Sequence, residues 1–412
     1  MKDKAKLLPL LVFYVLVVLF ASSNVIGGDQ VRYVWFANNL AHGYYSPRDN
    51  VDLWNGPGYP ILLLPFILVH LPWLVAKLLN ALLLFMAILY FHSTLRLYVR
   101  ERPALYLSCL LGIYLPFLRY IHLLLTEELA LFLMCGFLFH FCKLHRSSQT
   151  RWGQLAIVSV YLAYLALTKI FLGFVILTGL LLSVALYLWK RASALKRTVL
   201  VCCFALVCCS PYLVYTYSLT GKVFYWGNSG GIALYWMSNP KESELGDWFS
   251  PHDVFENPGQ FQPHLGFFRD LERLPSIQQD DELKRRVFYN ITHYPLGFFK
   301  NWLANVGRLL FSYPYAYTQQ KLSTYFYVLP NMFLFILSVL LIYPAFLGRR
   351  LIPYEIYAMT VFGIIYLIGI SLLSGVSPRQ SMLVVPVFFL WIVFILMRVL
   401  EFRVAEKRPF FS

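Results

Sequence analysis

Charged residues are scarce in this chain. Only 13% of its 412 residues are Asp, Glu, Lys or Arg, whereas a soluble domain typically carries about 25%. The same chain is 59% hydrophobic and 18% aromatic. These proportions exclude an ordinary soluble domain and indicate a protein whose main solvent is lipid.

Short segments of alternating polarity, which would signal a membrane β-barrel, are also lacking. Apolar runs of about 20 residues occur instead, and in lipid such runs form helices because every backbone N–H and C=O must be paired internally. The sequence therefore predicts an all-α polytopic membrane protein with about ten transmembrane helices. These helices are expected at residues 7–27, 74–95, 104–118, 123–142, 153–168, 171–189, 198–217, 326–346, 354–373 and 381–398.

Cysteine is lacking outside the apolar runs. All seven cysteines lie in or at the ends of such runs, so the sequence offers no disulfide framework. The doublets Cys202-Cys203 and Cys208-Cys209 are predicted to be small apolar residues rather than metal ligands. No cofactor is expected and no metal site is assigned, and the question of a divalent metal stays open.

Basic residues outnumber acidic ones by 35 to 20, and they concentrate in alternate short loops. Such loops face the cytoplasm, so this surplus is an orientation signal rather than a surface for nucleic acid. The basic stretches are 2–6, 96–102, 143–151, 190–197, 349–350 and 398–408. Both termini are then cytoplasmic, and the segments left outside are 28–57, 218–325 and 374–380.

Interfacial helices are predicted in both larger outer segments. In the first, Asp29 is expected to cap a helix that Gly43 ends. The residues expected to rest on the bilayer are Val31, Trp35 and Phe36. In the longer segment, residues 281–293 and 296–310 carry the apolar spacing of amphipathic helices.

Asp29 is the residue that most strongly indicates chemistry. It follows Gly27-Gly28 just beyond the first apolar run, and a carboxylate on the membrane rim is costly unless it is used. It is either a helix cap or a general base that faces an outer cavity. Arg32 lies one helical turn on, where it can hold an anion or tune the carboxylate.

Further charged residues fall at the outer ends of predicted spans. Glu127 and Glu128 begin one span, and either caps its helix or points into the cavity of Asp29. Lys169 and Arg379 are each either an interface anchor or a phosphate ligand. One acid and several cations from distant helices thus map to one membrane face, where they suit a negatively charged lipid head group.

Several motifs carry a family resemblance. They are Asp29-Gln30-Val31-Arg32-Tyr33, Gly56-Pro57-Gly58-Tyr59-Pro60, Leu125-Thr126-Glu127, Leu167-Thr168-Lys169, and Pro378-Arg379-Gln380 followed by Pro386. Because these motifs occur in this order along the chain, the chain resembles the GT-C superfamily of polytopic glycosyltransferases, particularly aminoarabinose transferases and protein mannosyltransferase-like enzymes. It departs from their pattern at Gln30, where a second acid is usual, and at Gln380, where a tyrosine is usual.

The resemblance implies a transferase that inverts a sugar delivered by a polyprenyl-phosphate donor. Asp29 would be the general base, with Arg379, Lys169 and Arg32 as ligands of the donor phosphate. Residues implied to contact sugar or acceptor, or to line the cavity, are Tyr33, Asp52, Tyr59 and Glu127. The acceptor would be the hydroxyl of a glycan, lipid or protein on the extracytoplasmic face of a membrane, expected to be the bacterial inner membrane.

The same interpretation of the sequence divides the chain into three parts. Residues 1–217 form a transmembrane catalytic module that includes the loop 28–57, residues 218–325 an extracytoplasmic aromatic-rich segment, and residues 326–412 the last transmembrane helices with a basic tail. The alternatives are a lipid-linked sugar flippase and an O-antigen polymerase or ligase. A transporter predicts polar residues near the bilayer midplane, whereas the charges here gather at one edge.

Overall fold

The computed structural model describes residues 2–147, 149, 151–320 and 322–400. All secondary-structure elements among these residues are helices, and none is a strand. This confirms the predicted all-α class. The first half contains α1 (Lys2–Ala5), α2 (Leu8–Ala21), α3 (Asp29–Ala41), α4 (Gly58–Leu68), α5 (Trp73–Leu95), α6 (Glu101–Gly112), α7 (Leu115–Leu118), α8 (Glu127–Arg146), α9 (Trp152–Thr168), α10 (Leu172–Lys190) and α11 (Ser193–Thr220).

The second half begins with shorter helices and returns to long apolar ones. It contains α12 (Gly230–Met237), α13 (Pro251–Glu256), α14 (Gln262–Glu272), α15 (Ser276–His293), α16 (Pro295–Phe311), α17 (Tyr325–Leu340), α18 (Ile342–Leu347), α19 (Tyr354–Ser371), α20 (Pro378–Ser381) and α21 (Val385–Phe394). Helices α15 and α16 confirm the two amphipathic helices that the sequence predicts at 281–293 and 296–310.

Among the described residues, seven helical stretches are long and apolar enough to cross a membrane. They are Trp73–Leu95, Glu127–Arg146, Leu172–Lys190, Ser193–Thr220, Tyr325–Leu347, Tyr354–Ser371 and Pro378–Val399. Each coincides with a predicted span. Helices α2 and α9 are apolar but shorter. The count of about ten full spans therefore stays a prediction.

The predicted span at 104–118 is wrong. It divides into α6 and α7, with a break around Ile113. Pro116 explains the break, because a proline has no N–H for the helix ladder and its ring collides with the carbonyl four residues earlier. Here that residue is Gly112, the last residue of α6.

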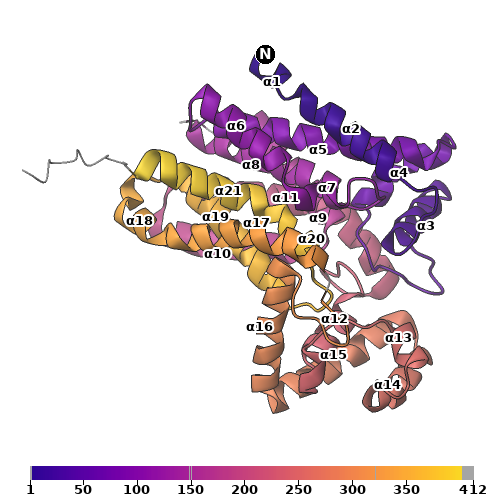
Figure 1. Cartoon of the computed structure of the whole chain (residues 1–412). Coiled ribbons are helices and arrows are strands. Elements are labelled where there is room, and N and C mark those ends of the chain that lie inside the picture. The colour runs from indigo at the N-terminus through magenta and orange to yellow at the C-terminus, as the bar shows by residue number, and fades with distance from the viewer. Residues whose placement is uncertain (1, 148, 150, 321, 401–412) are drawn as a thin grey trace, which may run out of the picture.

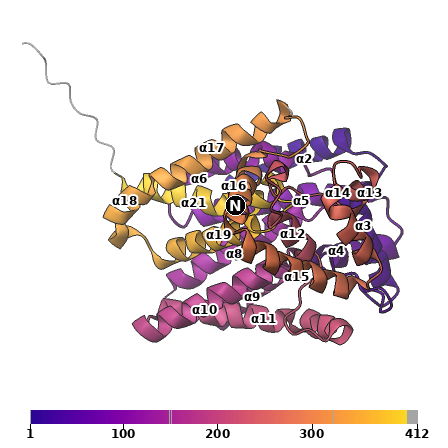
Figure 2. The same ribbon diagram turned by 90° about the horizontal axis from the view of Figure 1, so that it is seen from below.

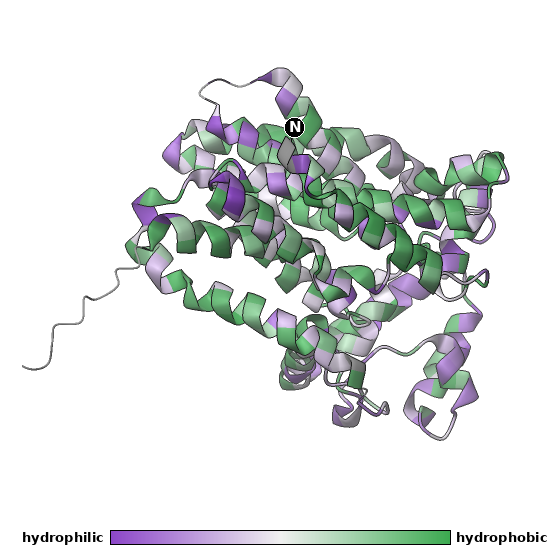
Figure 3. Ribbon diagram, turned by 45° about the horizontal axis from the view of Figure 1, so that its top comes forward, coloured by the Kyte–Doolittle hydropathy of each residue, from purple (hydrophilic) through white to green (hydrophobic). Residues whose placement is uncertain are grey.

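The transmembrane helices pack side by side. Helix α5 lies against α8, α8 against α9, and α9 against α11 (Figure 1). Hydrophobic residues dominate these helices, while hydrophilic residues gather at helix ends and over α12–α16 (Figure 3). In two perpendicular views, α18 lies at one end of the molecule and α3, α13 and α14 lie at the other (Figures 1 and 2).

Helices α12–α15 build a second hydrophobic cluster, separate from that of the bundle. Trp236 is fully buried there and stacks on Phe268 with ring centroids 5.7 Å apart. Because this segment has its own apolar core, it can hold a fixed shape beside the membrane helices.

The loop at residues 28–57 contains the predicted helix, with two corrections to its details. Gly28, not Asp29, is the cap residue of α3, and Asp29 occupies the first helical turn. Phe36 is fully buried and stacks on Tyr45 at 4.5 Å, so it does not rest on the bilayer. Val31 and Trp35 are exposed as expected, and Gly43, at φ +87°, follows the end of the helix.

Candidate active site

Asp29 reaches the surface because of the turn before it. Gly28 has φ +58°, a backbone conformation that glycine adopts far more easily than residues with a side chain. This turn redirects the chain into α3 and leaves the Asp29 side chain 37% exposed in the first helical turn. The positive end of the helix dipole favours a carboxylate at that position.

Arg379 arrives from the opposite end of the chain. Ser377 and Gln380 form a capping box around the start of α20, in which the Ser377 N–H donates to Gln380 Oε1 at 2.8 Å. Arg379 lies inside this fixed turn. Its Nη2 donates to Asp29 Oδ2 at 2.9 Å, although the two residues are 350 positions apart.

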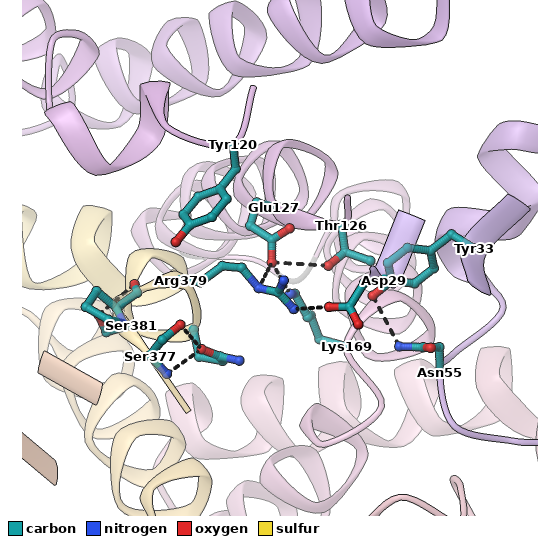
Figure 4. A network of polar contacts seen from close by, with 12 residues as sticks. Asp29, Tyr33, Asn55, Tyr120, Thr126, Glu127, Lys169, Ser377, Arg379 and Ser381 are labelled. Atoms are coloured by element: carbon teal, nitrogen blue, oxygen red, sulfur yellow. Dashed lines mark hydrogen bonds and ion pairs between the residues drawn. The ribbon is translucent and has the colours of Figure 1, made fainter. Parts of the chain in front are cut away.

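Glu127 joins two of the cations. It is the first residue of α8, only 2% of its side chain is exposed, and its Oε1 lies 2.8 Å from Lys169 Nζ. The same oxygen lies 3.1 Å from Arg379 Nε. Lys169 reaches it from the residue that follows the end of α9. Arg379 thus bridges two carboxylates, Asp29 on one side and Glu127 on the other (Figure 4).

Arg32 completes the group on the α3 side. Its Nη1 lies 3.8 Å from Asp29 Oδ1, and its guanidinium lies over the Trp54 ring at 4.9 Å. Asp29, Arg32, Glu127, Lys169 and Arg379 are called the ion-pair cluster below. With three cations and two carboxylates in ionised form, the cluster carries one net positive charge. It can therefore attract an anion, while Asp29 stays accessible.

A buried aromatic wall lies behind Asp29. The Tyr33 and Tyr59 rings meet edge to face at 5.3 Å. Asn55 Nδ2 donates to Tyr33 Oη at 3.2 Å (Figure 4). Tyr33 is 4% exposed and Tyr59 is fully buried, so Tyr59 supports the wall from behind and does not line an open surface. Asn55 lies in the turn-rich stretch 54–60, yet sequence reasoning did not single it out.

Asp52 is not brought to the cluster. Its carboxylate accepts the Trp54 N–H at 2.9 Å, and its own N–H donates to Ser46 Oγ at 2.8 Å. Among the described residues, no hydrogen bond or ion pair joins Asp52 to the ion-pair cluster. Asp52 closes its own loop, and its contact with sugar or acceptor stays a prediction.

Gln30 and Glu128 have buried side chains next to the cluster. Gln30 Oε1 accepts the Leu124 N–H at 2.9 Å, so the residue that replaces the usual second acid fastens α3 to the loop before α8. Glu128 is fully buried, and its carboxyl oxygens have no hydrogen-bond partner among the described residues. Within that same part of the chain, no three His, Cys, Asp or Glu residues are grouped so as to hold a metal ion.

Comparisons with proteins of known structure identify the fold of this chain. No family model and no curated protein sequence matches the chain. Among solved structures, it is similar to the oligosaccharyltransferase AglB from Archaeoglobus fulgidus in complex with an inhibitory peptide and a dolichol-phosphate, with a TM-score of 0.50 and 13% identity. The match covers 94% of this chain and 50% of AglB, so this chain spans about half the length of that protein.

The chain has a GT-C fold. The aminoarabinose transferase ArnT from Cupriavidus metallidurans is also similar. Its undecaprenyl-phosphate complex matches with a TM-score of 0.40 at 15% identity, over 94% of this chain and 77% of ArnT. Its apo state matches with a TM-score of 0.43 at 13% identity, over 96% and 78%. The match to AglB confirms the fold that the sequence motifs imply.

Proposed function

We propose that this protein is a membrane glycosyltransferase that moves a sugar from a polyprenyl-phosphate donor to an acceptor hydroxyl at the extracytoplasmic membrane face. Asp29 is the general base, and Arg379, Lys169 and Arg32 hold the donor phosphate. The observation that carries the proposal is the contact of Arg379 with Asp29 at 2.9 Å. It brings an exposed acid and a guanidinium together at one end of a lipid-embedded bundle.

The chemistry of such a transfer matches the cluster group by group. The acceptor O–H gives its proton to the Asp29 carboxylate while its oxygen attacks the anomeric carbon. The bond from that carbon to the phosphate oxygen breaks, and its electron pair leaves with polyprenyl phosphate. A single displacement of this kind inverts the anomeric carbon, because the attack comes from the side opposite the leaving group.

Arg379, Lys169 and Arg32 act on the leaving phosphate, where negative charge develops during the reaction. The leaving phosphate gains negative charge in the transition state, and donors fixed in advance stabilise it more than they stabilise the ground state. Glu127 holds both Lys169 and Arg379 in place before substrate arrives. A donor phosphate would compete with Asp29 for Arg379, so its binding would free the base for the acceptor. The dolichol-phosphate in the AglB complex supports a lipid phosphate as ligand.

Replacing Asp29 with Asn tests the base. The amide keeps the shape of the side chain but cannot accept the acceptor proton, so kcat should fall by about 10²–10⁴-fold. Transfer is measured in detergent or proteoliposomes with a radiolabelled polyprenyl-phosphate sugar and membrane acceptors. The matched control is Asp270→Asn, an exposed aspartate of α14 that should keep full activity. Normal transfer by a folded Asp29→Asn variant contradicts the proposal.

A further inference from the structure

A polar cavity lies on the side of Arg379 away from Asp29. It has a volume of about 360 Å³, and its lining includes Arg119, Tyr120, Tyr315, Tyr327 and Ser377. Pro378 lines it as well, so the two residues directly before Arg379 both border the cavity. The Tyr120 side chain lies beside Arg379 (Figure 4). The cavity is therefore next to the ion-pair cluster, and its hydroxyl-rich wall suits a phosphate and a sugar.

An apolar groove continues from this cavity along α17. The groove also has a volume of about 360 Å³, and Gln320 and Thr324 line both spaces. Phe311, Val328 and Met332 supply its apolar wall. Val328 and Met332 are four residues apart on a transmembrane helix and therefore share one face. A hydrocarbon chain can pass from the bilayer along this face toward the polar cavity.

Arg119 gives the cavity its charge. The side chain is exposed and its guanidinium lies over the Tyr327 ring at 5.8 Å. Tyr327 Oη is in turn hydrogen-bonded to Tyr120 Oη at 3.1 Å. Within the described residues, no carboxylate forms an ion pair with Arg119. An arginine without an acidic partner, fixed beside a hydroxyl-lined cavity, suits an anion such as a phosphate.

We propose that the cavity and the groove form the entry site of the lipid-linked donor. The first isoprene units occupy the groove along α17, and Arg119 receives the phosphate before it reaches Arg379. The two spaces together match one amphiphile, because an apolar channel leads into a polar chamber with a cation. That this amphiphile is the sugar donor rests on the proposed function. That the site binds a polyprenyl phosphate rests on the cavity and the groove alone.

Binding is measured directly, without transfer, on the purified full chain in detergent. The ligands are undecaprenyl phosphate, undecaprenol and inorganic phosphate. Wild type should bind undecaprenyl phosphate most tightly, because only that molecule fills both spaces. Arg119→Gln and Val328→Trp should each weaken this binding by about tenfold or more. Arg119→Lys, which keeps the charge, should lose less.

Two matched controls separate the site from general effects. Arg273→Gln removes an exposed arginine from the outer segment, and Val339→Trp places the same bulk farther along α17. Both should bind undecaprenyl phosphate as wild type does. Equal binding by wild type, Arg119→Gln and Val328→Trp overturns the entry site, as does equal affinity for undecaprenol and undecaprenyl phosphate. If Arg119→Gln does not fold, the binding of undecaprenyl phosphate by Arg119→Lys and Val328→Trp tests the entry site instead.

The two proposals fail in different ways. If transfer depends on Asp29 but binding is indifferent to Arg119 and Val328, the glycosyltransferase stands and the entry site falls. If binding depends on Arg119 and Val328 but no sugar is transferred, the lipid-phosphate site stands and the catalytic proposal falls.

Discussion

At the scale of single residues, Glu127 acts through other residues. Its carboxylate is buried against Lys169 and Arg379, so it has little room to meet a substrate directly. We infer that it is a positioning residue, since it fixes two cations at distances that a phosphate can share. The Leu-Thr-Glu sequence marks it as a span edge, but only the fold reveals which cations it holds.

Glu127→Gln tests this role. The amide keeps the volume but loses the charge, so Lys169 and Arg379 lose their common anchor and the donor phosphate is held less well. We expect KM for the donor to rise and kcat/KM to fall by about 10²-fold, in line with small displacements of a catalytic group. Glu355→Gln is the control, because Glu355 is also buried but accepts a hydrogen bond from Tyr98. An unchanged donor KM in Glu127→Gln removes the positioning role.

At the scale of elements, the Gly56-Pro57-Gly58 turn fixes the end of α9. A Cβ on Gly58 would lie 2.4 Å from Thr168 Oγ1 and 2.7 Å from Thr168 N, and one on Gly56 would lie 2.1 Å from Leu167 O. Only glycine lets the turn approach this closely. Because Lys169 follows Thr168, two motifs that are separate in the sequence form one contact that places a cation.

Gly58→Ala should therefore disturb Lys169 without touching it. The new methyl group forces α4 and α9 apart, and overpacking of this kind costs about 1–3 kcal/mol of stability. Transfer should fall as well, because the Lys169–Glu127 contact shifts. Gly153→Ala is the control at the other end of α9, where a Cβ meets nothing within 4 Å. Thermal unfolding and transfer rates of both variants are compared, and wild-type behaviour of Gly58→Ala refutes the packing argument.

The segment 218–325 contains a buried carboxylate whose protonation should destabilise the fold of that segment. Glu244 is fully buried, with Lys241 Nζ at 2.7 Å and His264 Nε2 at 3.1 Å. Burial by itself raises the pKa of Glu244, but the hydrogen bonds from His264 and Lys241 outweigh it and hold this pKa below the usual 4.5. A pKa that is lower in the folded than in the unfolded state stabilises the fold above the unfolded pKa, and this stability is lost as pH falls through the folded pKa.

Thermal unfolding measured against pH checks this expectation. The Tm of the wild type should decline as pH falls below about 4.5. Glu244→Gln should be less stable at pH 7 by about 3 kcal/mol, since it leaves buried donors without their anion, and it should lose part of the acid sensitivity. Glu242→Gln, which removes an exposed ion pair with Lys300, is the control and should behave as wild type. Parallel Tm curves for Glu244→Gln and wild type exclude Glu244 as the acid-sensitive group.

At the scale of the whole molecule, the sequence predicts spans better than contacts. Hydropathy locates the long helices because each must pair its backbone within lipid, whatever its neighbours are. It does not foresee that Phe36 turns inward to Tyr45, or that Asp52 closes its own loop. The convergence of Asp29 with Arg379 follows from motif resemblance and span ends, whereas Arg119 carries no motif and becomes visible only through the cavity that it lines.

The orientation of the bundle is the last prediction. Helix α8 starts at Glu127 in the cluster and ends at Arg146, and its 20 residues span about 30 Å, the thickness of the hydrocarbon core. We therefore expect the cluster and the basic loops to lie on opposite membrane faces. Since basic loops stay in the cytoplasm, the cluster should face outward.

Cysteine labelling on intact cells tests this orientation. A membrane-impermeant maleimide should label Glu272→Cys, at the end of α14, from outside. Arg102→Cys, in the basic stretch at the start of α6, should react only after permeabilisation. The unmodified chain measures the background from its seven native cysteines. Labelling of Arg102→Cys in intact cells would reverse the topology, and the cluster would then face the cytoplasm, where an extracytoplasmic donor cannot reach it.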